Sequence, residues 1–151
     1  MLDAKNDHYP VHYINPTVDL TKIKHVAFDM DGTIYKGGTL FEFTPGVFET
    51  LEKLGIGYTY LTNNSSKSAK DYLKKILSLN LKATPDNVST SATATYFFLR
   101  KNYPNVKKVY VLGTASLREE FAEQGYTLID EYNEKDEPDL VVVAFDTTLT
   151  Y

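Results

Sequence analysis

The chain has 151 residues, which is enough for one domain of ordinary size, or for one domain and part of a second. Its apolar fraction of 42% and charged fraction of 24% are those of a globular protein. The net charge of −4 argues against nucleic-acid binding through a basic surface, and the absence of cysteine excludes disulfides, thiolate zinc sites and cysteine nucleophiles.

The distribution of apolar residues predicts neither a secretory signal nor a membrane span. The opening segment MLDAKNDHYPVHYINP has no apolar stretch of the kind found in signal peptides. The longest apolar run, LVVVAF at 140–145, is too short to cross a bilayer. Because the chain also lacks cysteine, we expect a cytoplasmic protein.

The first elements are an arm, a strand and a flap. Residues 1–20 are polar, contain two prolines and predict an extended N-terminal arm. The apolar run HVAFDM at 25–30 predicts a short buried strand. Residues 32–43 contain three glycines and alternating large apolar side chains, which favour a turn and a small β-flap.

The rest of the first half alternates helices with strands. For the first helix we expect Thr44 as the N-cap, Pro45 in the first turn and Gly55 as the residue that ends it. The next predicted elements are a strand at 57–62, a helix at 67–79 with Ser66 as N-cap candidate, a strand at 87–91 and a helix at 92–102.

A similar alternation follows a predicted boundary near Tyr103 and Pro104. Because strands and helices alternate throughout, the sequence predicts an α/β fold with a parallel sheet. The polar stretch at 130–139 predicts a solvated loop. The predicted elements of this part are strands at 106–113, 126–129 and 139–145, and a helix at 115–124.

Two carboxylates stand at the end of the first predicted strand, in VAFDMDGTIY. Asp29 ends the strand, and Asp31 follows two residues later in the loop. Carboxylates this close resist joint ionisation unless a cation lies between them or one keeps a proton. A cation such as Mg²⁺ prefers oxygen ligands and bridges to phosphate, and a protonated carboxyl can act as a general acid. Gly32 permits a tight turn, in which backbone N–H groups can face an anion.

Polar side chains also follow the second predicted strand, in LTNNSS. Thr62 offers a hydroxyl at the strand end, and Asn63 and Asn64 add amide groups. Ligands of open parallel sheets bind beyond the carboxyl ends of the strands. Each of the two motifs alone is commonly a turn or a helix cap, but together at successive strand ends they predict an anion site.

The two motifs resemble those of a known family. DMDGT resembles the first motif of the haloacid dehalogenase superfamily, and LTNNS resembles its second. The resemblance continues through TPGVFETLEKLG, VSTSATAT, KVYVLGTASLREEF and VVVAFDTTLTY, and this pattern is similar to the NagD-like, 4-nitrophenylphosphatase-like branch with a class IIA cap. It covers residues 24–151. It implies a Rossmann-like core whose first half is residues 21–103, followed by part of an α/β cap at 104–151.

The resemblance also implies a mechanism. Asp29 would attack the phosphorus of a small phosphorylated metabolite, and Asp31 would protonate the leaving oxygen and then activate the hydrolytic water. Mg²⁺ would be held by the Asp29 carboxylate and the Asp31 backbone carbonyl. Thr62 and Asn63 would bind the transferring phosphoryl group, and Gly32 would contribute its loop. The expected activity is hydrolysis of phosphate monoesters, such as a sugar phosphate or 4-nitrophenyl phosphate.

The sequence departs from the family in two respects. The third-motif lysine and the acidic fourth motif are not found, and Lys36 and Lys67 are interpreted as solvated surface residues. We therefore expect a fragment of a longer enzyme. The strand at 25–30 would then have an open apolar edge, which a second copy of the chain could cover as a homodimer.

Two other functions fit parts of the pattern. The chain could be an inactive phosphate-binding or interaction module, because two motifs are missing. A phosphotransfer receiver domain also uses acidic residues at strand ends, but the Asp-x-Asp-Gly-Thr spacing and LTNNS argue against it.

Other polar signals are weaker. His8 and His12 are separated by a proline and offer too few ligands for zinc, and His25 is interpreted as structural. VLGTAS at 111–116 favours a turn over a phosphate site, and Asp146 fits a substrate contact and an ordinary strand end equally well.

Overall fold

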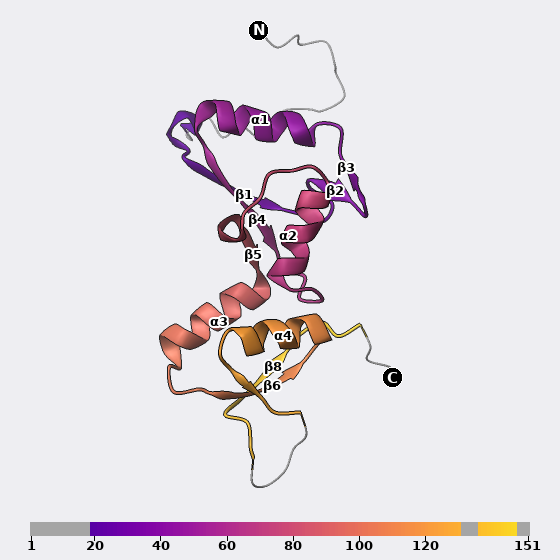
Figure 1. The fold of residues 1–151 in the computed structure, drawn as a ribbon. Helices are drawn as coiled ribbons and strands as arrows, with labels where there is room; N and C mark the ends of the chain where they lie inside the picture. The colour runs from indigo at the N-terminus through magenta and orange to yellow at the C-terminus, as the bar shows by residue number, and fades with distance from the viewer. Residues whose placement is uncertain (1–18, 131–135, 148–151) are drawn as a thin grey trace.

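A computed structural model of the protein describes residues 19–130 and 136–147 (Figure 1). Strands and helices alternate along this part of the chain, so the predicted α/β fold is confirmed. The elements are the 3₁₀ helices η1 (Leu20–Lys22) and η2 (Pro85–Asn87), the α-helices α1 (Thr44–Leu54), α2 (Ala69–Ser78), α3 (Ser91–Asn102) and α4 (Ala115–Glu123), and the strands β1 (His25–Asp29), β2 (Tyr35–Lys36), β3 (Thr39–Leu40), β4 (Gly57–Thr62), β5 (Val88–Thr90), β6 (Lys108–Leu112), β7 (Thr127–Leu128) and β8 (Leu140–Val143).

The first sheet places three strand ends side by side. Its strands are parallel in the order β1-β4-β5, with Asp29 beside Leu61 and Thr62 beside Thr90. Tyr60 of β4 is fully buried and belongs to a core with residues of α1 and α2, whereas its neighbour Leu61 is 45% exposed. Because successive side chains of a strand point to opposite faces, the two helices cover one face only.

β1 lies at the edge of this sheet. Its only strand neighbour among the described residues is β4, which matches the open edge expected for the strand at 25–30. The flap expected at 32–43 is present as the antiparallel pair β2–β3. The homodimer that would cover the edge of β1 stays a prediction.

The start of α1 differs from the prediction, and its end agrees with it. Thr44 is the first helical residue and not the N-cap, a position taken by Phe43 without a side-chain cap. The hydroxyl of Thr44 instead donates a hydrogen bond of 2.7 Å to the Ile34 carbonyl in the flap, where burial favours a satisfied donor. Gly55 ends the helix with a φ of 66°, a left-handed conformation that glycine adopts without steric cost.

α2 begins two residues later than predicted. Its N-cap is Ser68 and not Ser66: the Ser68 hydroxyl accepts from the Asp71 N–H, and the Ser68 N–H donates to the Asp71 carboxylate, each at 3.2 Å. The Ser66 N–H donates to Asn64 Oδ1 at 2.9 Å. This local Asx-type turn holds the preceding segment outside the helix.

The second sheet is also parallel, in the order β7-β6-β8. Val109 and Val111 of β6 pack with Leu117 and Phe121 of α4 in a second core. α3 also contributes to this core, although it precedes the predicted boundary near residues 103 and 104, which stays a prediction. Within the described parts of the chain, no helix is long and apolar enough to span a membrane.

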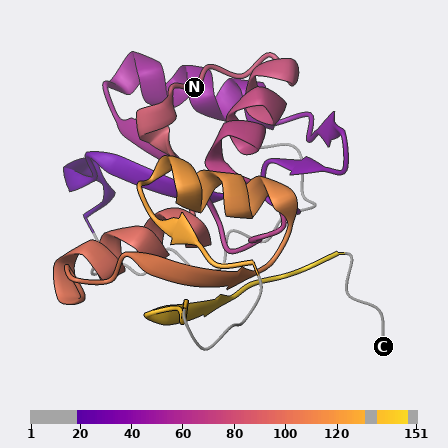
Figure 2. The ribbon, with the colours of Figure 1, turned by 60° about the horizontal axis from the view of Figure 1, so that its bottom comes forward.

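α2 and α4 join the two parts of the molecule (Figure 2). In the views of Figures 1 and 2, α4 lies between its own sheet and the helices of the first sheet. The Ser116 hydroxyl donates to the Asp71 carboxylate, and the Lys70 ammonium pairs with Glu123. The Ala69 N–H at the start of α2 donates to the buried Glu120 carboxylate at 3.4 Å.

Candidate active site

The loop after β1 folds back on itself and presents two carboxylates. Gly32 has a φ of 87°, a conformation that favours glycine, and its N–H donates to the Tyr35 carbonyl at 2.8 Å. The turn predicted for Gly32 is therefore present, but its N–H is used within the loop. The Thr33 hydroxyl donates to Asp29 Oδ2 at 3.1 Å, which fixes one oxygen of that carboxylate.

The end of β4 contributes a buried hydroxyl. Thr62 is 3% exposed, and its hydroxyl oxygen accepts from the Asn64 N–H at 3.1 Å. That bond uses an oxygen lone pair, and the Thr62 hydroxyl also interacts with the Tyr72 side chain by a hydrogen bond. Asn63 and Asn64 are exposed beside it.

These groups meet in one cavity of about 630 Å³. Asp29, Asp31, Thr62 and Asn63 all line it, so the sequence-predicted site residues come together with the exception of Gly32. The other residues that line the cavity are Leu61, Asn64, Thr90, Ser91 and Ala94.

The residues at the end of β5 line the cavity but were not predicted from the sequence. Thr90 and Ser91 line the cavity, and Thr90 also caps α3 by accepting from the Thr93 N–H at 3.1 Å. The Ser91 hydroxyl is buried and has no hydrogen-bond partner within the described part of the chain. The signal in the sequence was the third predicted strand, which ends in Thr-Ser and whose carboxyl end reaches the same edge of the sheet.

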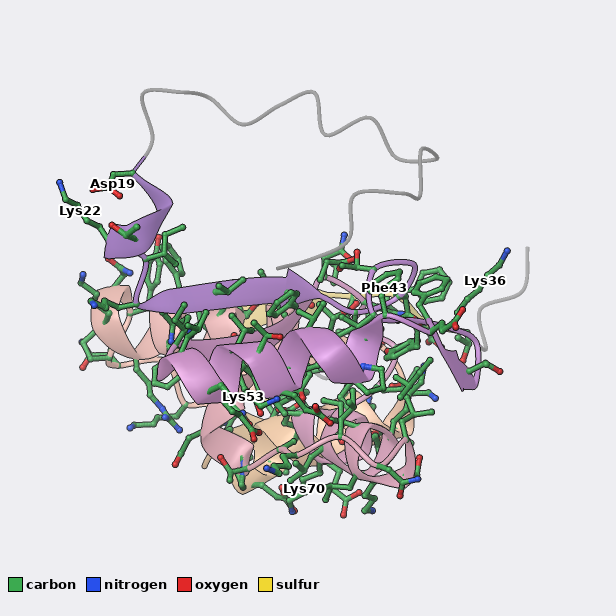
Figure 3. The ribbon with its side chains drawn as sticks, turned by 90° about the horizontal axis from the view of Figure 1, so that it is seen from above. Asp19, Lys22, Lys36, Phe43, Lys53 and Lys70 are labelled. Carbon is green, nitrogen blue, oxygen red and sulfur yellow. The ribbon has the colours of Figure 1, made fainter. Side chains whose placement is uncertain are left out.

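Two further side chains contact Asp31, and neither was predicted. The Lys75 ammonium lies 3.5 Å from Asp31 Oδ1, and the Tyr35 hydroxyl donates to Asp31 Oδ2 at 3.3 Å. Burial, followed by the negative charge of Asp31, raises the pKa of the Tyr35 hydroxyl well above its ordinary value, so it remains a donor. Lys36 and Lys67 are exposed, as interpreted, and Figure 3 shows Lys36 pointing away from the flap.

The oxygen ligands that the cavity offers are of the type that Mg²⁺ prefers. Within the described residues, no group of three or more His, Asp or Glu side chains is placed to hold a metal ion. Mg²⁺ commonly uses one or two protein carboxylates, several waters and the oxygens of a bound phosphate. Asp29 and Asp31 line one cavity, so the Asp29 carboxylate and the Asp31 backbone carbonyl named above would suit Mg²⁺ together with a phosphorylated ligand.

The weaker signals are mostly structural. The ring of His25 bonds to the Thr59 hydroxyl at 2.8 Å across β1 and β4, which agrees with a structural role. In VLGTAS, the Thr114 hydroxyl accepts from the Leu117 N–H and caps α4, as expected of turn chemistry. His8 and His12 lie outside the described residues, and the role of Asp146 stays a prediction.

Residues 26–127 match the family of haloacid dehalogenase-like hydrolases. The chain belongs to this family. The family resemblance and the fold that it implied are therefore confirmed.

Individual relatives of the chain are named as phosphatases or as a nucleotidase. The 5'-nucleotidase YutF of Bacillus subtilis is 33% identical over 128 residues, which are 85% of this chain and 48% of the relative. The crystal structure of 4-nitrophenylphosphatase from Thermotoga maritima has a TM-score of 0.76 and 33% identity, and the match covers 87% of this chain and 48% of that one. The glycerol phosphate phosphatase of Mycobacterium tuberculosis, in complex with magnesium, has a TM-score of 0.71 and 25% identity, over 87% of this chain and 39% of that one. The chain thus spans about half the length or less of these relatives.

Proposed function

We propose that this chain carries the nucleophile and the phosphate-binding groups of a Mg²⁺-dependent phosphatase for small phosphate monoesters. One observation supports this function above the others: Asp29, Asp31, Thr62 and Asn63, from two different strand ends, line one cavity. The names of the relatives support the same reaction class. The prediction that the chain is a fragment of a longer enzyme stays a prediction.

In the proposed reaction, Asp29 attacks phosphorus and the bond from phosphorus to the ester oxygen breaks. Asp31 gives its proton to the departing oxygen, so that an alcohol leaves and an aspartyl-phosphate remains. Asp31 then takes a proton from water, which attacks the aspartyl-phosphate and releases inorganic phosphate. The Thr62 hydroxyl and the Asn63 amide donate to the phosphoryl oxygens. When bound by Asp29 and Asp31, Mg²⁺ would supply positive charge against the phosphoryl oxygens.

We also propose a substrate class, a cellular compartment and a partner. The substrate class is a small phosphorylated metabolite, which a cavity of about 630 Å³ would hold. We propose the cytoplasm as the compartment. We propose a second copy of the chain, bound at the edge of β1, as the partner.

Phosphate binding without turnover is the second candidate function. It is favoured by the short donor set, since the described residues bring only two carboxylates to the cavity. A site of this kind would bind phosphate weakly and release no product.

The two functions differ in phosphate release from 4-nitrophenyl phosphate, measured with and without Mg²⁺. For the phosphatase, we expect release that needs Mg²⁺ and is reduced at least about 1,000-fold in Asp29→Asn, because the amide is no nucleophile. Asp86→Asn is the matched control, since Asp86 is an exposed aspartate in η2 and does not line the cavity.

Equal release by the wild type and Asp29→Asn would contradict the phosphatase function. Binding of inorganic phosphate that is weakened by Thr62→Val, without any turnover, would instead favour the second candidate.

A further inference from the structure

Lys75 of α2 reaches the predicted acid–base residue. Its ammonium nitrogen lies 3.5 Å from Asp31 Oδ1, although the two residues are 44 positions apart in the sequence. The Lys75 side chain is only 24% exposed, so the packing around it restricts its position. A positive charge therefore lies beside the Asp31 carboxylate.

Tyr35 occupies the other side of Asp31. Its hydroxyl donates to Asp31 Oδ2 at 3.3 Å, and the residue is fully buried. The Lys75 ammonium lies 3.7 Å from the centre of the Tyr35 ring, which is a cation–π contact. Each oxygen of Asp31 thus has its own donor, and the two donors pack against each other.

The position of Lys75 on α2 explains this contact. Tyr72 and Ile76 are buried on the face of α2 that packs on the first sheet. Lys75 lies three residues after Tyr72 and one before Ile76, which puts it at the border of that face. Its aliphatic stem can cover apolar surface while its charged end stays at the rim. The neighbouring Lys74 is exposed.

We propose that Lys75 and Tyr35 are positioning residues, which hold the Asp31 carboxylate in the orientation needed for proton transfer. Neither of them is among the described residues that line the cavity, so they act through Asp31 and not on the substrate. This inference rests on the proposed function, in which Asp31 carries the proton. Lys75 also supplies a protein cation beside Asp31, a group for which the sequence offered only Lys36 and Lys67.

The first test replaces Lys75 with Met, which removes the charge and keeps most of the side-chain volume. With 4-nitrophenyl phosphate and saturating Mg²⁺, we expect kcat to fall about tenfold, because a misplaced acid–base group loses part of its effect. KM should stay within about twofold, since no substrate contact is removed. Lys75→Arg should restore most of kcat, and Tyr35→Phe should lower it in the same direction.

Lys74→Met is the matched control on the same helix and should leave kcat unchanged. A kcat of Lys75→Met equal to that of Lys74→Met would overturn the proposal. So would a Lys75→Met variant whose defect lies wholly in KM.

A double-mutant cycle separates positioning from a general effect on the fold. In an Asp31→Asn background, Lys75→Met should lower kcat no further, because the group that Lys75 holds is already lost. An equal loss in both backgrounds would show that Lys75 acts elsewhere, and would overturn the proposal.

Thermal unfolding of the same four proteins tests the contact without catalysis. If Lys75 and Asp31 interact, the shifts in unfolding temperature of the single variants should fail to add by about 1–3 °C in the double variant. If the wild type released no phosphate, the proposed function would fail and this cycle would decide alone. Coupling would then support the positioning of Asp31, and additive shifts would overturn it.

Discussion

Thr62 is the buried residue among the predicted site residues. It is 3% exposed, whereas Asp29, Asp31 and Asn63 are exposed. A buried hydroxyl keeps its orientation, because the surrounding atoms leave it few alternatives. Its oxygen accepts from the Asn64 N–H, which leaves the hydroxyl proton for a donor role.

Replacing Thr62 with Val should therefore damage the site more than the fold. The side-chain shape is kept, but the donor to the phosphoryl oxygens is lost, and we expect kcat/KM to fall about 100-fold. Thr62→Ser restores the hydroxyl and should recover most of the activity. Steady-state kinetics of the two variants provide the measurement, and a Val variant within twofold of the wild type would exclude Thr62 from phosphoryl binding.

The sequence predicted the site residues that follow β1 and β4, but not those at the end of β5. Asp29 and Thr62 could be placed together because successive strands of an α/β unit end at one edge of the sheet. Lys75 and Tyr35 could not be predicted, because their contacts depend on how α2 is rotated over the first sheet and on how the flap folds back. The spacing of residues along the sequence specifies neither the rotation of α2 nor the path of the flap.

At the scale of single elements, the predictions failed at the starts of α1 and α2, whereas the predicted start at residue 115 is that of α4. Both predicted N-caps, Thr44 and Ser66, carry the right kind of side chain, but each makes another contact. Thr44 bonds to the flap, and the Ser66 carbonyl accepts from the Thr114 hydroxyl at 3.0 Å. For Thr44 the tertiary contact replaces the cap, whereas Ser66 is held outside the helix by the bond from its N–H to Asn64 Oδ1. The end of α1 at Gly55 was predictable, because a left-handed conformation favours glycine whatever lies nearby.

The two serines before α2 allow a direct comparison. Ser68→Ala removes the side-chain acceptor of a capping box and should lower the free energy of unfolding by about 1 kcal/mol. Ser66→Ala should cost less, because Ser66 does not cap the helix. Urea unfolding of both variants tests this order. The reverse order would restore Ser66 as the cap.

At the scale of the whole molecule, a buried carboxyl lies where the two parts meet. Glu120 of α4 is 5% exposed and accepts from the Ala69 N–H. Burial raises the pKa of Glu120 above its ordinary value of 4.5, the Ala69 hydrogen bond opposes the rise, and the charges of Glu123 and Asp71 add to it. The folded state therefore binds this proton more tightly than the unfolded chain does. The resulting stability is complete below the unfolded pKa, and it is lost as the pH rises through the raised pKa.

Glu120→Gln should remove this penalty at neutral pH. The amide has nearly the same shape and can still accept from Ala69, so the unfolding temperature should rise by about 2 °C near neutral pH. The difference from the wild type should shrink as the pH falls through 4.5, and it should vanish well below 4.5, where Glu120 is protonated in both states. Thermal unfolding at several pH values, with the exposed Glu119→Gln as control, checks this. A pH-independent difference would argue against a titrating Glu120.

The segment after Asn64 lies beside the cavity and also contacts the second part of the molecule. On one side it continues from the amides that line the cavity, and on the other Ser65 Oγ accepts from the Phe145 N–H at 2.9 Å, next to the Ser66 carbonyl that Thr114 contacts. If a phosphate bound in the cavity fixed this segment, it would also strengthen the contact of the second sheet with the first. By thermodynamic reciprocity, whatever tightens or loosens the second sheet changes the anion affinity by the same factor. Under the proposed function, phosphate binding and the association of the two halves of the molecule would therefore be linked.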